Sequence, residues 1–204
     1  PWLSAAPLIE MLDEQQQRRP PYPITWSEQA ELMEHLPAHL QRMALFALNC
    51  GARDDNVCKL RWQWERAVPE LKRSVFVIPA KEFKGKRPHV LVLNDVAWQI
   101  VESCRGVDEE FVFVWRRERV KNVDVEPVMP YRPVHTMNNT AFQTARRKAG
   151  LDRLRVHDLR HTFAVRRMLL WHADGTDIDQ MMLALSTYMG HAKISNTYWY
   201  LTGV

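Results

Sequence analysis

Apolar side chains recur every three to four residues over most of the chain, which is the spacing of helices that bury one face. The clearest stripe predicts a helix over residues 40–50, with Pro37 as its opening residue. Short β-branched runs interrupt the helical pattern and predict strands. The predicted helices cover residues 25–35, 40–50, 94–104, 136–150, 156–173, 178–189 and a last one from 195 onward. The predicted strands cover residues 74–78, 89–93 and 111–114.

The ends of several helices are marked in the sequence. Thr25 and Glu28 have the spacing of a capping box, and Gly51 is placed to end the second helix. Thr136 is expected to start the helix that ends at Gly150, and Ser195 with Asn196 is expected to cap the last helix. The order of elements predicts an α+β fold that is mostly α-helical with a small antiparallel β-sheet.

Composition sets limits on the class of protein. With 204 residues, 46% hydrophobic and 25% charged, the chain is long enough for a substantial core and typical of globular proteins. Cys50, Cys58 and Cys104 are widely spaced and contain no C-x-x-C pair, which argues against a disulfide framework or a cysteine zinc site. The net charge of +4 is unevenly distributed, because residues 105–169 hold 14 Lys and Arg against 8 Asp and Glu. Such a segment suits a surface that tracks phosphates, or simply a solvated basic face.

Two short blocks carry the candidate chemistry. Val156–Phe163 contains His157 and Arg160, which share a helix face because they stand three residues apart. A guanidinium with fixed donors beside a titratable imidazole suits a phosphate that undergoes chemistry. The second block places His191 after a glycine and Tyr200 nine residues later.

The order of these blocks resembles the C-terminal catalytic half of the tyrosine recombinase (phage integrase) family. The resemblance implies the α+β fold of that catalytic domain, an upstream arginine after a helix, and a lysine in a β-hairpin. Arg53 follows the helix that ends at Gly51, although Ala52 and Asn56 depart from the family's usual Leu and Glu. The hairpin expected between residues 78 and 89 holds the lysine.

The resemblance also implies the roles of these side chains in breaking and rejoining DNA without metal or cofactor. Tyr200 attacks phosphorus and forms a 3′-phosphotyrosyl bond, which conserves the energy of the phosphodiester and needs no ATP. Arg53 and Arg160 clamp the non-bridging oxygens, and His191 donates a hydrogen bond to the same phosphate. His157 is the general base and Lys84 the general acid.

Alternatives exist for several of these residues. Lys81 and Lys86 compete with Lys84, while Tyr188 and Tyr198 compete with Tyr200, which alone has the nine-residue offset from His191. His157 and His161, four residues apart, have the spacing of a zinc pair, but neither a following Glu nor a nearby third ligand accompanies them, so His161 is expected to pack or hydrogen-bond beneath the site.

The sequence is therefore interpreted as a site-specific recombinase of integrase type that acts as a homo-tetramer on double-stranded DNA, without a membrane segment. Residues 1–23 are expected to be the linker from an N-terminal core-binding domain, and residues 24–204 the catalytic domain. A bacterial or phage-encoded, cytoplasmic and nucleoid-associated protein is expected. Basic segments 116–121 and 146–155 are candidate phosphate contacts. A catalytically silent DNA-binding relative and a type IB topoisomerase are the rival interpretations.

Overall fold

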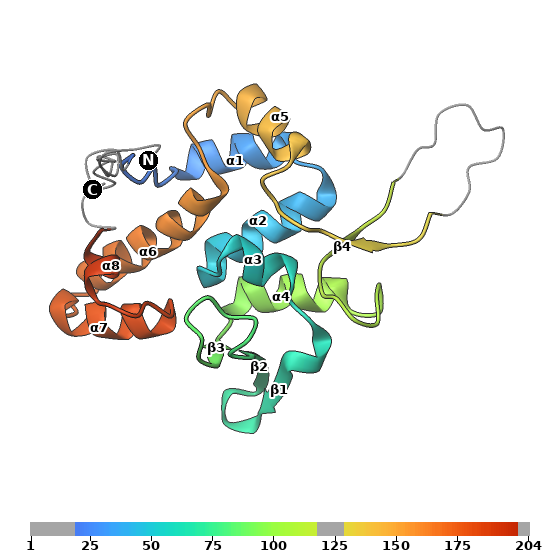
Figure 1. Cartoon of the computed structure of the whole chain (residues 1–204). Coiled ribbons are helices and arrows are strands. Elements are labelled where there is room, and N and C mark those ends of the chain that lie inside the picture. Colours follow the sequence, from blue (N-terminus) through green and yellow to red (C-terminus); the bar gives the residue numbers. More distant parts are fainter. Residues whose placement is uncertain (1–18, 118–128, 200–204) are drawn as a thin grey trace, which may run out of the picture.

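The structure, a computed structural model, describes residues 19–117 and 129–199. Helices dominate it, as the hydrophobic spacing predicts (Figure 1). The α-helices are α1 (Trp26–His35), α2 (Ala38–Cys50), α3 (Asp54–Cys58), α4 (Asp95–Cys104), α5 (Thr140–Lys148), α6 (Val156–Ala173), α7 (Ile178–Tyr188) and α8 (Ser195–Tyr198). Single 3-10 turns occupy Trp62–Trp64 and Pro69–Leu71.

The strands form two small antiparallel sheets. They are β1 (Glu65–Val68), β2 (Arg73–Ile78), β3 (His89–Leu91), β4 (Val114–Trp115) and β5 (Arg132–Pro133). The first sheet has the order β1-β2-β3, and β4 pairs with β5 in the second. Phe76 lies opposite Leu91 in the β2–β3 pair, so the predicted hairpin is confirmed. The loop between these two strands holds the candidate lysines.

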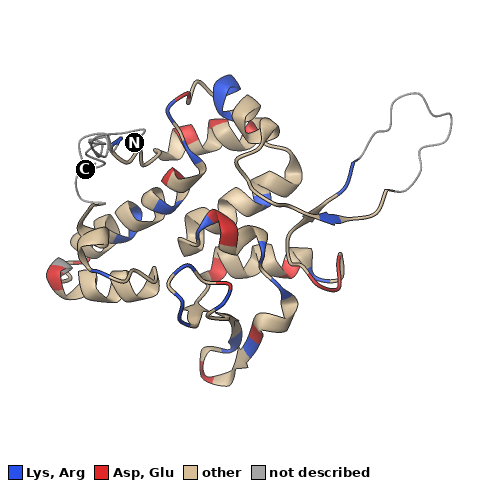
Figure 2. Ribbon diagram, in the orientation of Figure 1, with Lys and Arg blue, Asp and Glu red and all other residues tan. Residues whose placement is uncertain are grey.

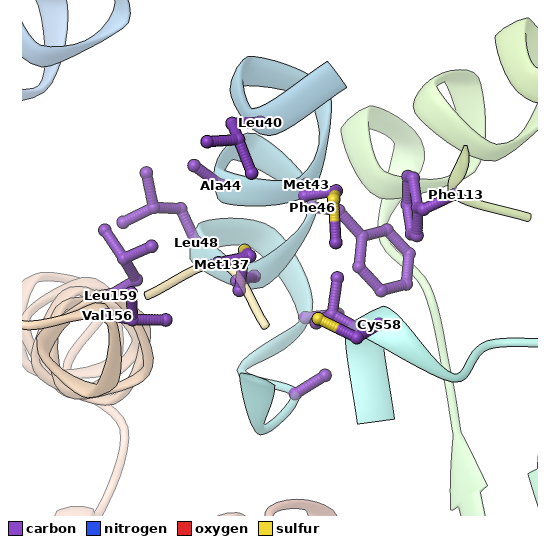
Figure 3. Packing of buried hydrophobic residues seen from close by; sticks show 14 of the residues in the cluster. Leu40, Met43, Ala44, Phe46, Leu48, Cys58, Phe113, Met137, Val156 and Leu159 are labelled. Atoms are coloured by element: carbon purple, nitrogen blue, oxygen red, sulfur yellow. The ribbon is translucent and has the colours of Figure 1, made fainter. Parts of the chain in front are cut away.

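Helix α2 forms the centre of the main core. Its residues Leu40, Met43 and Phe46 are fully or almost fully buried. Figure 3 shows α2 between Leu159 of α6 on one side and Phe113 on the other. Phe46 and Phe113 meet edge to face with ring centroids 5.1 Å apart, a favourable aromatic geometry. The core therefore fixes α6 relative to α2.

A second, smaller cluster joins the later turns of α6 to α7, and these two helices lie side by side in Figure 1. Met182, Leu185 and Met189 of this cluster are buried, as the spacing of apolar positions in α7 predicts. Glycine ends both α2 and the turn after α7, at Gly51 and Gly190, each with a left-handed φ. The carbonyls of Gly51 and Met189, at the ends of α2 and α7, both accept hydrogen bonds from Arg160, so these two helix ends lie beside the first turns of α6.

The predicted starting and capping residues of two helices differ from those observed. The helix α5 begins at Thr140 with Asn139 as its N-cap, not at Thr136, because the Thr136 hydroxyl donates to Asp54 at 2.6 Å. Ser195 and Asn196 do not cap α8 either. Ile194 precedes its first residue, and Ser195 is already helical.

The strands also differ in length and number from the prediction. The expected strand over 111–114 is interrupted: Phe111 forms an isolated antiparallel bridge with Arg61, and β4 begins only at Val114. Strand β1 was not predicted, because an exposed edge strand needs no apolar alternation. Strand β3 ends at Leu91, and the next carbonyl, of Val92, accepts a hydrogen bond from Tyr188 at 2.6 Å.

Among the described residues, no helix is long and apolar enough to cross a membrane.

Candidate active site

The guanidinium of Arg160 is held where three helices meet. It projects from the second turn of α6 and donates to two backbone carbonyls, those of Gly51 and of Met189, the latter at 2.6 Å. Gly51 ends α2 with φ +63°, and Met189 caps α7. Carbonyls at helix ends carry partial negative charge, so both favour a cation. The position of Arg160 is therefore set by the backbone ends of α2 and α7.

Arg53 reaches the same helix end from another direction. It precedes the first residue of α3, and its Nη2 donates to the carbonyl of Gly190 at 3.4 Å. Its guanidinium also lies over the ring of Phe83, 5.0 Å from the centroid. Arg53 and Arg160 thus bind neighbouring carbonyls of the chain after α7. The two arginines expected from the sequence are brought together.

His191 lies between Arg160 and α8. Its Nε2 is 2.9 Å from Arg160 Nη2, and its Nδ1 is 2.8 Å from the Thr197 hydroxyl. Because arginine can only donate, His191 Nε2 accepts here, and Nδ1 carries the proton. Burial, then the charges of Arg160 and Arg53, lower the pKa of His191 to about 3. In this state His191 is neutral and accepts a hydrogen bond where the sequence interpretation expects it to donate one to phosphate.

His157 is the second residue of α6 and lies at the edge of the site. Its ring remains exposed and meets the buried ring of His161 edge to face, with centroids 4.7 Å apart. Partial desolvation, then the neighbouring charges of His161 and Arg160, lower the pKa of His157 to about 4. Solvent screens part of that effect because the side chain is exposed. His157 is therefore a neutral imidazole near neutral pH, as a proton acceptor must be.

Lys84 lies on the loop between β2 and β3, exposed to solvent. It lines a hollow of about 420 Å³ together with Arg53, Asn56 and the two rival lysines, Lys81 and Lys86. Figure 2 shows Lys and Arg gathered on this loop. The structure brings all three lysines to the hollow that Arg53 lines and does not choose among them.

Two residues next to the site, Phe83 and His89, were not predicted from the sequence. Phe83 is buried and stacks on His89 with centroids 4.3 Å apart, and both lie against Gly190. Burial, then Arg160 and Arg53, lower the pKa of His89 to about 4. These contacts join the lysine loop to the end of α7. No local pattern could reveal them, since the partners are about a hundred residues apart.

Of the three candidate tyrosines, the two that the structure describes differ in their environments. Tyr200 lies outside the described residues. Tyr188 is engaged in the fold, because its hydroxyl donates to Val92 and its ring stacks on Phe163. Burial raises the pKa of Tyr188 above that of a free tyrosine, which makes it a poor nucleophile. Tyr198 is 42% exposed on α8.

Some of the basic segments serve the fold. Arg146 donates to the carbonyls of Asp152 and Leu154, at 2.9 and 2.6 Å, and Arg155 pairs with Asp158 at 2.8 Å. These side chains hold the loop before α6. In segment 116–121, only Arg116 and Arg117 belong to the described residues, and both are exposed.

The two departures from the family pattern are buried next to Arg53. Ala52 is 6% exposed and Asn56 5%. Asn56 lies in the short helix α3, where its backbone N–H donates to the carbonyl of Arg53 at 2.9 Å. Within the described ranges, no group of three or more His, Cys, Asp or Glu side chains could hold a metal ion.

Comparison with known proteins gives a family to which this geometry can be related. The model of the phage integrase family matches residues 24–203. The integrase of Salmonella phage P22 is 30% identical over 166 residues, which are 79% of this chain but only 40% of that protein. The chain thus spans less than half the length of this relative.

Solved structures show the same fold at low sequence identity. The XerA recombinase matches with a TM-score of 0.60 and 17% identity, over 90% of this chain and 59% of that one. The Tn1549 transposon integrase, in complex with transposon right end DNA, matches with a TM-score of 0.58 and 15% identity, over 90% of this chain and 62% of that one.

The family match covers nearly the whole chain and includes every candidate site residue from Arg53 to Tyr200. This chain belongs to the phage integrase family.

Proposed function

We propose that the chain is the catalytic domain of a site-specific recombinase that cleaves and rejoins DNA through a 3′-phosphotyrosyl intermediate. The observation that carries the proposal is the pair of guanidinium groups of Arg53 and Arg160 at the carbonyl end of α7, beside His191. Two arginines and an imidazole that converge on one point suit a phosphate with growing negative charge. Membership of the family supports the same reaction class.

In the proposed reaction, Tyr200 is the nucleophile. His157 takes the proton of its hydroxyl, and the phenolate oxygen attacks phosphorus. Arg53 and Arg160 stabilise the pentavalent phosphorane, which carries more negative charge than the phosphodiester of the ground state. The bond to the 5′ oxygen then breaks, and Lys84 protonates that oxygen as it leaves. A second 5′ hydroxyl reverses these steps and rejoins the strands. The family model includes Tyr200, although this residue lies outside the described ranges.

A bound phosphate is expected to change the state of His191. In the structure, the nearby arginines and burial favour the neutral imidazole. A phosphate anion beside Arg160 opposes the arginine charge and raises the pKa of His191. The protonated ring then has a second N–H, on Nε2, and can donate it to a non-bridging oxygen. We propose that DNA binding thus converts His191 from acceptor to donor.

We further propose double-stranded DNA as the partner, a homo-tetramer as the active assembly, and a cytoplasmic, nucleoid-associated location. The DNA complex of the Tn1549 integrase supports the first of these. Residues 1–23 are proposed as the linker from a core-binding domain and 24–204 as the catalytic domain, since the family match begins at residue 24. Among the rival interpretations, a silent DNA-binding relative is disfavoured by the convergence of Arg53, Arg160 and His191, which DNA binding alone does not need.

The test is covalent trapping by the full chain. The substrate is a pool of nicked suicide duplexes with randomised sequence around the nick, so no target site has to be assumed. After denaturation, sequencing of the DNA retained on protein gives the site. We expect an adduct that Tyr200→Phe abolishes and Tyr198→Phe retains. Retention of the adduct in Tyr200→Phe would overturn the assignment of the nucleophile. DNA binding without any adduct would favour the silent relative.

A further inference from the structure

A buried carboxylate follows the proposed general base in the chain. Asp158 sits in the first turn of α6, next to His157, and its side chain is fully buried. The proposed reaction gives Asp158 no role. Burying a carboxylate is costly unless donors surround it, so its partners indicate what it does.

The donors to Asp158 come from three parts of the chain. Oδ2 accepts from the backbone N–H and Nε of Arg155, at 2.8 and 3.0 Å. Oδ1 accepts from Arg155 Nη2 at 2.8 Å and from the backbone N–H of Tyr22 at 3.3 Å. The third donor is His161, whose Nδ1 lies 3.0 Å from Oδ1. Asp158 thus ties the chain before α1 and the loop before α6 to a histidine one turn further along α6.

The bond to His161 has a defined direction. Burial opposes ionisation of Asp158, but the hydrogen bonds from His161 and Arg155 outweigh it and lower the pKa of the carboxyl. An ionised carboxylate can only accept, so the proton must be on His161 Nδ1. His161 is 4% exposed, and it meets His157 edge to face with an interplanar angle of 82°. The ring that Asp158 fixes is therefore the surface against which the exposed ring of His157 rests.

We propose that Asp158 and His161 are positioning residues for His157. Asp158 fixes the ring plane and the tautomer of His161, and His161 in turn restricts the side-chain rotation of His157. A general base contributes only when its nitrogen is within reach of the proton that it abstracts, so orientation of this exposed ring affects the rate directly. This inference rests on the proposed role of His157 as the base towards Tyr200.

The competing explanation is that Asp158 only caps α6. Its contacts with the backbone and side chain of Arg155 form a capping interaction, which stabilises a helix without affecting chemistry. The two explanations differ in whether the effect of Asp158 on the rate depends on His157. A double-mutant cycle measures that dependence.

The cycle uses Asp158→Asn and His157→Ala, singly and together, in the full chain. The readout is the single-turnover rate of adduct formation on the duplex selected by trapping, at a temperature where all variants are folded by circular dichroism. We expect Asp158→Asn to slow cleavage by about tenfold or more in the wild-type background, a fraction of what a general base contributes. We expect less than a twofold change in the His157→Ala background. Equal slowing in both backgrounds would overturn the inference.

Thr162→Val is the matched control. The Thr162 hydroxyl is in the same buried cluster, where it donates to the carbonyl of Asp158 at 2.8 Å and accepts from the N–H of Ile24 at 3.0 Å. Its removal is expected to lower the melting temperature, because buried donors and acceptors lose their partner, and to leave the cleavage rate within twofold. A loss of rate equal to that of Asp158→Asn would indicate a merely structural role and would overturn the inference.

A second measurement is independent of activity. Nitrogen-15 spectra of the histidine rings report which nitrogen carries the proton. We expect wild-type His161 to be protonated at Nδ1, and Asp158→Asn to lose this signal and to shift the ring resonances of His157. Unchanged ring resonances of His157 in that variant would contradict this inference but not the proposed function. Wild-type protein that forms no adduct would contradict the proposed function.

Discussion

Arg160 donates a hydrogen bond to the carbonyl of Gly51, a residue 109 positions earlier in the chain. This carbonyl is available because α2 stops at Gly51 in a left-handed conformation. The same glycine lies against Phe163, since a Cβ at position 51 would be 2.5 Å from its Cδ1. Both the close packing of α2 on α6 and the position of Arg160, which is proposed to bind phosphate, thus depend on the absence of a side chain at Gly51.

Gly51→Ala is therefore expected to be strongly destabilising. The left-handed backbone costs a non-glycine residue about 1–2 kcal/mol, and the contact with Phe163 adds the cost of moving a buried ring. We expect the free energy of unfolding in urea to fall by about 3 kcal/mol in total. Gly175→Ala is the matched control, because Gly175 has a φ of +70° but nothing within 4 Å of an added Cβ. Equal losses in the two variants would contradict the packing argument.

His89 gives the fold a dependence on pH. Its pKa in the folded chain is about 4, below the value of about 6.5 of an unfolded histidine. Between these values the unfolded chain binds more protons than the folded one, so the free energy of unfolding falls as the pH falls from 6.5 towards 4. Above about pH 6.5, His89 imposes no such penalty.

Replacing His89 by leucine should reduce this acid sensitivity. His89 is 9% exposed, so the contribution that it removes is of the order of 2–3 kcal/mol between pH 6.5 and 4. The measurement is the free energy of unfolding at several pH values in both proteins. We expect the curve of His89→Leu to be flatter over this range, whatever its absolute stability. Parallel curves would exclude His89 as a source of acid sensitivity.

Local signals in the sequence predicted much of the fold. The capping box of Thr25 and Glu28 is present, with the Glu28 carboxylate accepting from the Thr25 N–H at 2.8 Å. Gly51 ends its helix as predicted. These features succeed because a cap involves residues only three or four apart. Thr136 failed as a cap because a distant residue, Asp54, binds its hydroxyl, and the nearby Asn139 caps α5 instead.

In the candidate site too, the sequence predicted which residues take part but not the contacts between distant parts of the chain. The resemblance in residue order predicted Arg53, Arg160 and His191, and the structure brings these three together. The resemblance did not predict that Phe83 and His89 lie against Gly190. It also did not predict that His191 Nε2 accepts a hydrogen bond from Arg160 in this structure. Those facts depend on how the lysine loop packs on the end of α7, and no spacing in the sequence contains that information.

Arg166 joins α6 to the start of α1 and is expected to contribute to stability. Its guanidinium lies 3.5 Å from the ring centroid of Trp26 and donates to Gln29 Oε1 at 2.6 Å and to the carbonyl of Ile24 at 3.3 Å. Lysine has a single ammonium and cannot serve these separate partners. We expect Arg166→Lys to lower the free energy of unfolding by about 1–2 kcal/mol.

The control for Arg166 is an exposed arginine of another helix. Arg147 on α5 donates from Nε to the carbonyl of Gln143 at 3.1 Å, an interaction within one helix. Arg147→Lys should change the free energy of unfolding by less than about 0.5 kcal/mol, as is usual at the surface. Both variants are measured by urea denaturation in the same buffer. A loss at Arg166 no larger than that at Arg147 would show that the contacts with α1 do not stabilise the fold.

The assignment of the general acid can be tested through the leaving group. Lys81, Lys84 and Lys86 all line the hollow beside Arg53, so position alone does not identify the acid. A normal 5′ oxygen leaves as a strongly basic alkoxide and needs a proton. A sulfur in its place leaves as a thiolate, whose conjugate acid has a pKa of about 8.5, and needs none. Loss of the true acid should therefore be rescued by sulfur at the bridging 5′ position.

We expect Lys84→Ala to slow adduct formation on the normal duplex by about a hundredfold or more, within the usual range for a general acid. On the sulfur-substituted duplex, Lys84→Ala should be within a few-fold of the wild-type chain. Lys81→Ala and Lys86→Ala are the matched controls, because they remove the same charge from the same loop. If either control, rather than Lys84→Ala, showed the loss and its rescue, the acid would be that lysine. A loss that sulfur does not rescue would mean that Lys84 binds DNA without transferring a proton.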